Sequence, residues 1–469
     1  MPEAQVQTYI HPVDPFHDMY DTDYASFSTG SRLGRVCRHW RDVTLCTPAL
    51  WASIFIEITN SPYSSKTPER LKLYLQRSKA SALSIALQVG ALTLTSIHFE
   101  LILLVLQNAH RITRLALHLT KGGVKITDLF QRHFSRPFTA LTTLIVKADY
   151  NEDPCKVVEA LNKQSSSLRH IGISSFGRFG YKPLPIPQLT GLTINTISID
   201  MLSLILSTST HLQSLNASIQ FFGNPLATIP VLEDLRSLDI KLLYGPFPFG
   251  CKEFTFNGYR KLVNLLSAPN LNRLSVKMSV EVEQYPEWRA SSVMDTFRDF
   301  ASEFKSFIAR CPVIQSFSLV SAYFEDSQLL SILGKMPNLL ALDVVDAVKG
   351  QMAVTNRLME ALGTREVLPK LKDLRLDLPE FNLRQGAFEE MLWSRRKHMH
   401  AHGDRLRSAY LKVDDVAMPD LDPDDLRELQ REGLAVRVVY VRPSTKYWRQ
   451  DEEVELVGYR VTPSGKGFC

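Results

Sequence analysis

Apolar residues recur along the chain in the order apolar-x-x-apolar-x-apolar, in which x is mostly polar. The last two apolar positions of each copy alternate with polar residues, a period typical of a half-buried strand. Successive copies start 21 to 43 residues apart, and a weaker copy at Ala80, Leu83 and Ile85 precedes them. We predict strands centred on Leu115, Leu144, Ile171, Leu192, Leu215, Leu238, Leu274, Phe317, Leu342, Leu374 and Ala409.

The segments between these strands have helical spacing of apolar residues, most clearly in Ser96–Asn108, Asp200–Ser207 and Met294–Arg310. Prolines stand just before several strands, where they stop a helix; they are Pro269, Pro312, Pro337 and Pro369. Alternating strands and helices predict parallel strands joined by helical crossovers. A repeat of roughly 20–29 residues is typical of leucine-rich repeats. The alternative is a doubly wound α/β domain, but the chain has no GxGxxG turn after an early strand.

We therefore predict an α/β fold: a leucine-rich-repeat solenoid with a parallel concave sheet and outer helices, capped by a short helical segment at its N-terminal end. The expected boundaries are an irregular N-terminus over 1–30, the helical segment over 31–60, the solenoid over 61–442 and a C-terminal tail over 443–469.

Composition limits the classes of function. The 469 residues carry a formal net charge of only +5, with dispersed basic residues, whereas nucleic-acid binders concentrate positive charge. Leu101–Leu106 is far too short an apolar run to span a bilayer, and Met1–Thr8 lacks the apolar core of a signal peptide. The six cysteines form no CxxC pair. We expect a soluble cytoplasmic or nuclear protein with reduced thiols and neither nucleic acid nor membrane as partner.

The segment ahead of the first repeat predicts two short helices. An apolar stripe at helical spacing runs from Leu33 to Val43, and Thr47-Pro48 is typical of a helix start. Leu50 and Ile54 give the second helix an apolar side. We expect Trp40 and Trp51 to be mainly buried and to join these helices to the first repeat.

The sequence LGRVCRHWRDVTLCTPALWASI, Leu33–Ile54, resembles the second half of an F-box from the large fungal F-box/leucine-rich-repeat families. Leu368–Leu378, Met391–His400 and Leu429–Val439 resemble the closing repeats of these families. Residues 1–30 contain no LPxExLxxIF-type first helix. The resemblance implies docking on the Skp-type adaptor of a cullin–RING ubiquitin ligase, and the missing helix predicts weaker binding. The implied F-box core or docking residues are Leu33, Val36, Cys37, Trp40, Leu50 and Trp51.

Catalytic motifs are missing from the sequence, which has no GxSxG elbow and no GxxxxGK[ST] loop. His398, His400 and His402 would share one side of a strand, but the neighbouring Arg395 and Arg396 repel a metal cation, so we interpret this segment as a solvated basic connector. We predict no catalytic residues, no cofactor, no metal and no enzymatic activity.

Residues between the buried positions of each strand should point to the concave sheet face. These candidates for target binding are His118, Lys147, Asn195, Asp239, Lys241, Lys277, Asp343, Arg375, Asp377, Tyr410 and Lys412. Their mixed charge suits a protein partner. Two aromatic inserts supply further candidate contacts or cover an edge of the solenoid; these residues are Tyr244, Phe247, Phe249, Tyr285 and Trp288.

The resulting hypothesis is an F-box-type substrate-recognition adaptor of a cullin–RING ubiquitin ligase, which binds an unknown target protein through its solenoid. One alternative is a stand-alone interaction scaffold with no ligase association. Another is an enzyme or nucleic-acid binder built on a repeat frame.

Overall fold

The structure is a computed structural model. It describes residues 33–58, 66–90, 95–119, 137–148, 154–175, 187–220, 228–244, 257–280, 291–320, 324–346, 353–378, 383–397, 405–413, 421–442 and 452–455. The chain divides into two compact units, 1–195 and 196–469.

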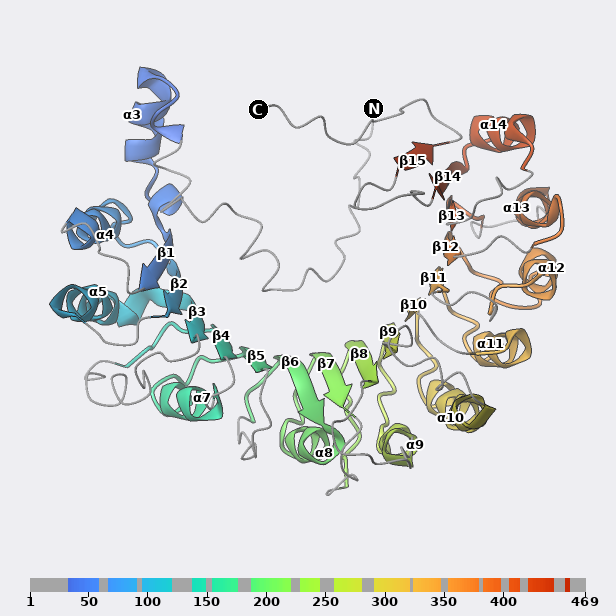
Figure 1. The fold of residues 1–469 in the computed structure, drawn as a ribbon, viewed down its shortest axis with the longest axis horizontal. Helices are drawn as coiled ribbons and strands as arrows, with labels where there is room; N and C mark the ends of the chain where they lie inside the picture. The colour runs from blue at the N-terminus through green and yellow to red at the C-terminus, as the bar shows by residue number, and fades with distance from the viewer. Residues whose placement is uncertain are drawn as a thin grey trace. The chain divides into compact units, whose positions relative to one another are not determined.

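Strands and helices alternate in the first unit, and the helices α4, α5 and α7 lie along one side of the sheet (Figure 1). Its elements are α3 (Arg38–Cys46), the 3-10 helix η1 (Pro48–Trp51), β1 (Ser53–Ile58), α4 (Lys66–Arg77), β2 (Leu83–Val89), α5 (Ser96–Gln107), the 3-10 helix η2 (Ala109–Arg111), β3 (Ile112–Leu119), β4 (Thr143–Ala148), α7 (Pro154–Asn162), β5 (His170–Ser175) and β6 (Gly191–Ser198), within which the unit ends.

The second unit repeats the same alternation, again with its helices on one side of the sheet (Figure 1). Its elements are α8 (Ile199–Thr208), β7 (Ser214–Gln220), β8 (Ser237–Tyr244), α9 (Asn257–Leu265), β9 (Arg273–Val280), α10 (Ser291–Ala309), β10 (Ser316–Val320), α11 (Asp326–Leu333), β11 (Ala341–Val345), α12 (Asn356–Thr364), β12 (Asp373–Leu378), α13 (Ala387–Lys397), β13 (Ser408–Val413), α14 (Pro423–Arg431), β14 (Ala435–Arg442) and β15 (Glu452–Glu455).

Within each unit, each strand pairs with the next in chain order. The pairs from β1 to β6 and from β7 to β14 are parallel, and β15 pairs antiparallel with β14. Parallel neighbours require a crossover between consecutive strands, and the helices supply it. The predicted α/β class, parallel sheet and outer helices are therefore confirmed within each unit.

All eleven predicted strand centres lie in strands and are buried. Within β12, for example, Leu374 and Leu376 are buried, whereas Arg375 and Asp377 between them are half-buried. Because side chains alternate across a strand, one face of each sheet packs against the helices. We call the other face the open face. The four prolines predicted to stop helices lie in turns just before β9, β10, β11 and β12.

The turns before the strands are joined by backbone hydrogen bonds that continue the sheet outward. In the second unit, Asn272 N donates to Arg236 O at 3.0 Å, and Gln315 N then donates to Asn272 O at 2.8 Å. Leu340 N extends the series by donating to Gln315 O at 2.8 Å. These bonds pair backbone groups of one turn with those of the next, so each repeat fixes the start of the next strand.

Two strands lie in segments for which the sequence predicted none. The sheet begins at Ser53, inside the segment predicted to be helical over 31–60, so Ile54 belongs to β1 and not to the second short helix. Burial of every second residue, Ile54, Ile56 and Ile58, is a strand pattern. The strand has only six residues and follows the turn at Pro48 closely, so the sequence pattern did not separate it from the helical segment. The predicted C-terminal tail contains β15. In the part of the chain that the structure describes, no helix combines the length and the apolar character needed to cross a membrane.

Candidate functional site

The N-terminal helical segment is anchored to the first unit through Trp51. This side chain is only 3% exposed, stacks on Tyr74 with ring centroids 5.3 Å apart, and lies 4.4 Å beneath the guanidinium of Arg77. Its Nε1 donates to Thr44 O in α3 at 2.7 Å, and Thr44 is the buried residue of that helix. Trp51 therefore joins α3 to α4, as predicted for this tryptophan. Thr47 stands at the N-cap position of η1 and Pro48 in its first turn, as predicted, although the Thr47 hydroxyl donates to Val43 O of α3 and does not cap η1.

The burial predicted for Trp40 is wrong. Trp40 is 43% exposed and Val36 is 67% exposed, while Val43 is also exposed. The predicted continuous stripe is interrupted because Cys37 is extended, with φ −158° and ψ 177°, so that α3 starts only at Arg38. Cys37 is exposed as well, and Leu33 and Leu50 are half-buried. Val36 lies in the turn before α3, and Trp40 and Val43 lie on the helix; together we call these three exposed apolar residues the α3 face.

Three arginines alternate in sequence with the residues of the α3 face. Arg35, Arg38 and Arg41 are exposed, and Arg41 Nε donates to Gly34 O at 3.2 Å, which closes the turn ahead of the helix. Asp42 is the acidic residue of α3. An apolar patch bordered by positive charge is complementary to an apolar groove with an acidic rim.

Three residues predicted for target binding lie in one row on the open face of the first unit. His118, Lys147 and Ser174 are in register on β3, β4 and β5, and Asn195 follows on β6. Asn195 Nδ2 donates to Ser174 Oγ at 3.4 Å. His118 is buried instead of lying at a solvated surface.

The other eight candidates lie on the open face of the second unit, where register forms two rows. Asp239, Ser275, Ser318, Asp343, Arg375 and Tyr410 follow one another in the first row, and Lys241, Lys277, Val320, Val345, Asp377 and Lys412 in the second. The structure thus brings these candidates together as an ordered surface, in a unit separate from His118, Lys147 and most of β6.

Most charges between β11 and β13 are paired with one another. Asp343 Oδ1 lies 3.6 Å from Arg375 Nε, and Ser318 Oγ donates to Asp343 Oδ2 at 3.0 Å. Asp377 Oδ1 lies 3.6 Å from Lys412 Nζ.

Tyr410 lies between two arginines on this surface. Its ring is 4.9 Å from the guanidinium of Arg375 and 5.9 Å from that of Arg437. Cation–π contacts of this kind hold the planar groups in fixed positions, so this part of the open face is preorganised.

The region across β8 and β9 has a different balance of charge. Lys241 and Lys277 are direct neighbours in register, and Arg273 lies on the same face of β9. Asp239 is the acidic group among them. Burial raises the pKa of Asp239, while a hydrogen bond from Ser275 and the charges of Arg273 and Lys277 act in the opposite direction.

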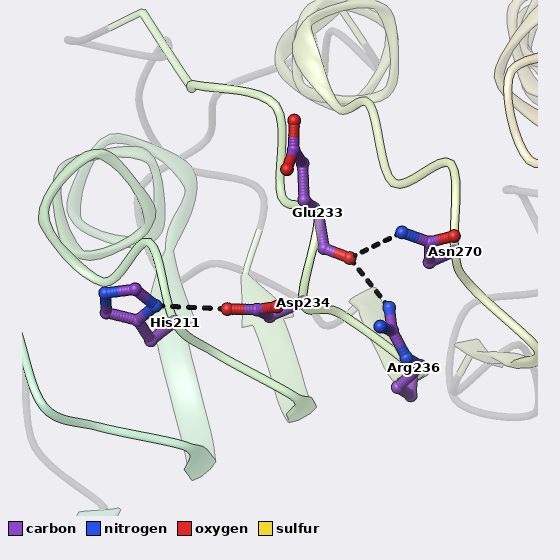
Figure 2. Close-up of polar contacts among 5 residues, drawn as sticks. All are labelled: His211, Glu233, Asp234, Arg236 and Asn270. Carbon is purple, nitrogen blue, oxygen red and sulfur yellow. Dashed lines mark hydrogen bonds and ion pairs between the residues drawn. The ribbon is translucent and has the colours of Figure 1, made fainter.

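A polar cluster connects the turns before β7, β8 and β9 (Figure 2). His211 Nδ1 lies 3.0 Å from Asp234 Oδ2, and the backbone oxygen of Glu233 accepts from Arg236 Nη1 at 2.7 Å and from Asn270 Nδ2 at 2.9 Å. The carboxylate of Glu233 points away from these donors. The His211–Asp234 pair is exposed to solvent. We assign the cluster to the joining of successive turns, because its contacts go to backbone carbonyl groups and a neighbouring turn.

A set of buried arginines was not recognised in the sequence as functional or structural. Arg395 Nη1 donates to Leu368 O at 2.8 Å, its Nη2 to Val367 O at 2.9 Å and its Nε to Leu362 O. The prediction of a solvated basic connector is therefore wrong for Arg395, which is 1% exposed, and for Arg396, which is 8% exposed.

Arg111 and Arg310 make the same kind of contact. Arg111 donates to carbonyls at the end of α4, and Arg310 donates to carbonyls at the end of α9. In each case the arginine lies in the next helix along the chain, or just after it, and binds the end of the helix before. The sequence signal that could have identified them is an arginine near the end of a helix, one repeat after the helix whose last carbonyls it binds.

Several predicted residues lie outside the described part of the chain. These are the insert residues Phe247, Phe249, Tyr285 and Trp288, and the histidines His398, His400 and His402. Tyr244 is the last residue of β8. Among the described residues, no group of three or more His, Cys, Asp or Glu side chains is arranged to hold a metal ion.

Comparisons with known proteins add little. No family model matches the chain, and no curated protein matches it. Among solved structures, the chain is similar to the crystal structure of a protein from Bacteroides fragilis, with 14% identity, a TM-score of 0.30, and coverage of 67% of this chain and 69% of that one. A similarity of this size carries no inference about family or function.

Proposed function

We propose that this protein is a leucine-rich-repeat adaptor of the F-box type, which binds a cullin–RING ubiquitin ligase through its N-terminal helical segment and a target protein through the open face of its repeats. The observation that carries the proposal is the exposed α3 face. Burial against a partner would be favourable for its three exposed side chains, by about 1.5–3 kcal/mol for each large apolar one.

The anchoring of α3 supports this role. Trp51 holds the helix against the first repeat, so the α3 face is presented on a fixed support and not on a free tail. A surface that is already ordered loses less conformational entropy when a partner binds. The bordering arginines favour a partner with an acidic rim.

The repeat architecture supports the second half of the proposal. Parallel strands with helices on one side leave a long row of side chains on the open face of each unit, and such surfaces are used for protein recognition. The leucine pattern in the sequence supports leucine-rich repeats as the type of repeat.

A pull-down with a purified Skp-type adaptor tests the ligase half. Three proteins are compared: the chain as it is, the chain with a complete F-box first helix placed ahead of Leu33, and that extended chain with Val36→Ser and Trp40→Ser. We expect weak binding by the first, tight binding by the second and loss of binding by the third. Leu73→Ser in the extended chain is the control, because Leu73 is an exposed apolar residue on α4.

Failure of both the original and the extended chain to bind would contradict the ligase assignment. The stand-alone scaffold would then be favoured, since the open face remains available without any ligase contact. Equal binding by the extended chain and its Val36→Ser, Trp40→Ser variant would show that the α3 face is not the docking surface.

A further inference from the structure

The open face across β8 and β9 concentrates positive charge, with three cationic side chains around one carboxylate. We call Lys241, Arg273 and Lys277 the basic site. Arg273 and Lys277 are exposed and Lys241 is half-buried. With Asp239 counted, the local formal charge is +2, from three cations and one anion.

The arrangement of the two lysines is unfavourable for the fold itself. Lys241 and Lys277 are in register on adjacent parallel strands, which are about 4.8 Å apart. Like charges on directly neighbouring strand positions destabilise a sheet. The same row contains Ser218 on β7 and Val320 on β10, so the repeat architecture does not require lysine at these positions.

The neighbours of the basic site are small and polar. Arg273 is flanked in register by Ser237 on one side and Ser316 on the other. Short side chains beside long cationic ones leave space at the level of the charged groups, and hydroxyl groups can donate to an anion. Two acidic groups on nearby strands have partners outside the basic site, Asp343 with Ser318 and Asp377 with Lys412.

From these observations we infer that the basic site binds a short segment of the target protein that carries a run of acidic residues. The inference rests on the proposed role of the open face as the target-binding surface. The charges from β11 to β13 are mostly paired with one another, so the excess of positive charge does not continue along the row of strands, and the site suits a short anionic segment better than a nucleic acid.

The experiment measures fluorescence anisotropy of labelled probes with the full chain. The probes are a short peptide with a run of glutamates, the same peptide with phosphoserines in place of the glutamates, the same peptide with glutamines, and a single-stranded RNA. We expect both anionic peptides to bind at least about tenfold more tightly than the glutamine peptide at low salt, and the difference to shrink as salt is raised. The phosphoserine peptide distinguishes a phosphorylated from a merely acidic segment, since phosphate carries more charge.

The double variant Lys241→Gln, Lys277→Gln should weaken binding of the anionic peptides at least about fivefold. Its matched control is Lys335→Gln, Arg357→Gln, which removes the same charge from exposed positions beyond the C-terminal end of α11 and on α12. The control should bind as the unaltered chain does. Thermal melts of both variants verify that the fold is retained.

Equal affinity for the glutamine and glutamate peptides would overturn the inference, and so would equal losses in the double variant and its control. Preferential binding of the RNA would replace it with a nucleic-acid site. The double variant is also carried through the adaptor pull-down, where it should behave as its parent. Peptide binding without adaptor binding would refute only the ligase half of the proposed function, and the reverse result would refute only the basic site.

Discussion

Replacement of Arg395 by methionine should strongly destabilise the second unit. The guanidinium is buried and bonded to three backbone carbonyls, those of Leu362, Val367 and Leu368, at the end of α12 and just beyond it. In this segment Arg365 and Leu368 have positive φ angles of 60° and 55°. Left-handed conformations of non-glycine residues cost about 1–3 kcal/mol each, so the segment keeps this shape only while other contacts hold it.

The size of the effect follows from two opposing contributions. Hydrogen bonds from a charged donor stabilise by about 1.5–3 kcal/mol each, or about 5–9 kcal/mol for three. Burial lowers the pKa of Arg395 from 12.5 to about 10, which corresponds to a cost of about 3 kcal/mol for the charged form. Methionine removes both contributions and leaves the carbonyls without their donor. We therefore expect a loss of about 2–6 kcal/mol in the free energy of unfolding.

Urea denaturation followed by circular dichroism measures this loss, and hydrogen exchange locates it. The segment from α12 to the start of β12 should exchange faster in Arg395→Met. Arg395→Lys keeps a positive charge but cannot reach three carbonyls in a fork, so it should lose most of the same stability. Arg357→Met, on the exposed side of α12, is the control and should change stability by less than about 0.5 kcal/mol.

An unchanged urea midpoint for Arg395→Met would refute the conclusion that Arg395 of α13 stabilises the C-terminal end of α12. Full stability in Arg395→Lys, together with a loss in Arg395→Met, would show that charge near the end of α12 matters and that the fork geometry does not.

Three further predictions concern other residues. Trp51→Ala should lower stability by about 3–5 kcal/mol in a thermal melt, whereas Trp40→Ala should leave the melting temperature nearly unchanged, because only Trp51 is buried. Burial raises the pKa of Asp346 from 3.8 to about 6, so this carboxyl group favours the fold when protonated, and its contribution is lost as pH rises through 6. Asp346→Asn should match the stability of the parent chain below pH 4 and exceed it above pH 6 by at most about 3 kcal/mol. Urea titrations at the two pH values measure the difference. Burial raises the pKa of the Cys311 thiol to about 11, so mass-spectrometric mapping should find Cys37 alkylated in the native protein and Cys311 only after denaturation.

The α3 face illustrates how far sequence spacing can be taken. The stripe from Leu33 to Val43 indicated an apolar surface, and both the helix from Arg38 and the 3-10 turn after Thr47 follow from local signals. Spacing alone assigned Trp40 and Trp51 the same environment. The structure separates them, because Trp51 stacks on Tyr74 of α4 and is buried, whereas Trp40 is exposed.

The target-binding candidates show the same division. Alternation within each strand identified which side chains leave the core, and register then determined which of them become neighbours. The pairing of Lys241 with Lys277, on which the basic site rests, joins positions 36 residues apart, on either side of the crossover that contains α9. The pattern within one strand does not determine its register with the next strand.

The sequence by itself determined the repeating strands, the helices between them and the parallel topology, because these depend on the periodicity of apolar residues and on prolines that stop helices. Only the tertiary structure decided the contacts made across repeats. The fork of Arg395, the anchoring of Trp51 and the neighbours of Lys277 each depend on where a distant segment lies. Apolar periodicity is a property of one segment, whereas a hydrogen bond or a charge pair requires two segments to meet at a defined distance.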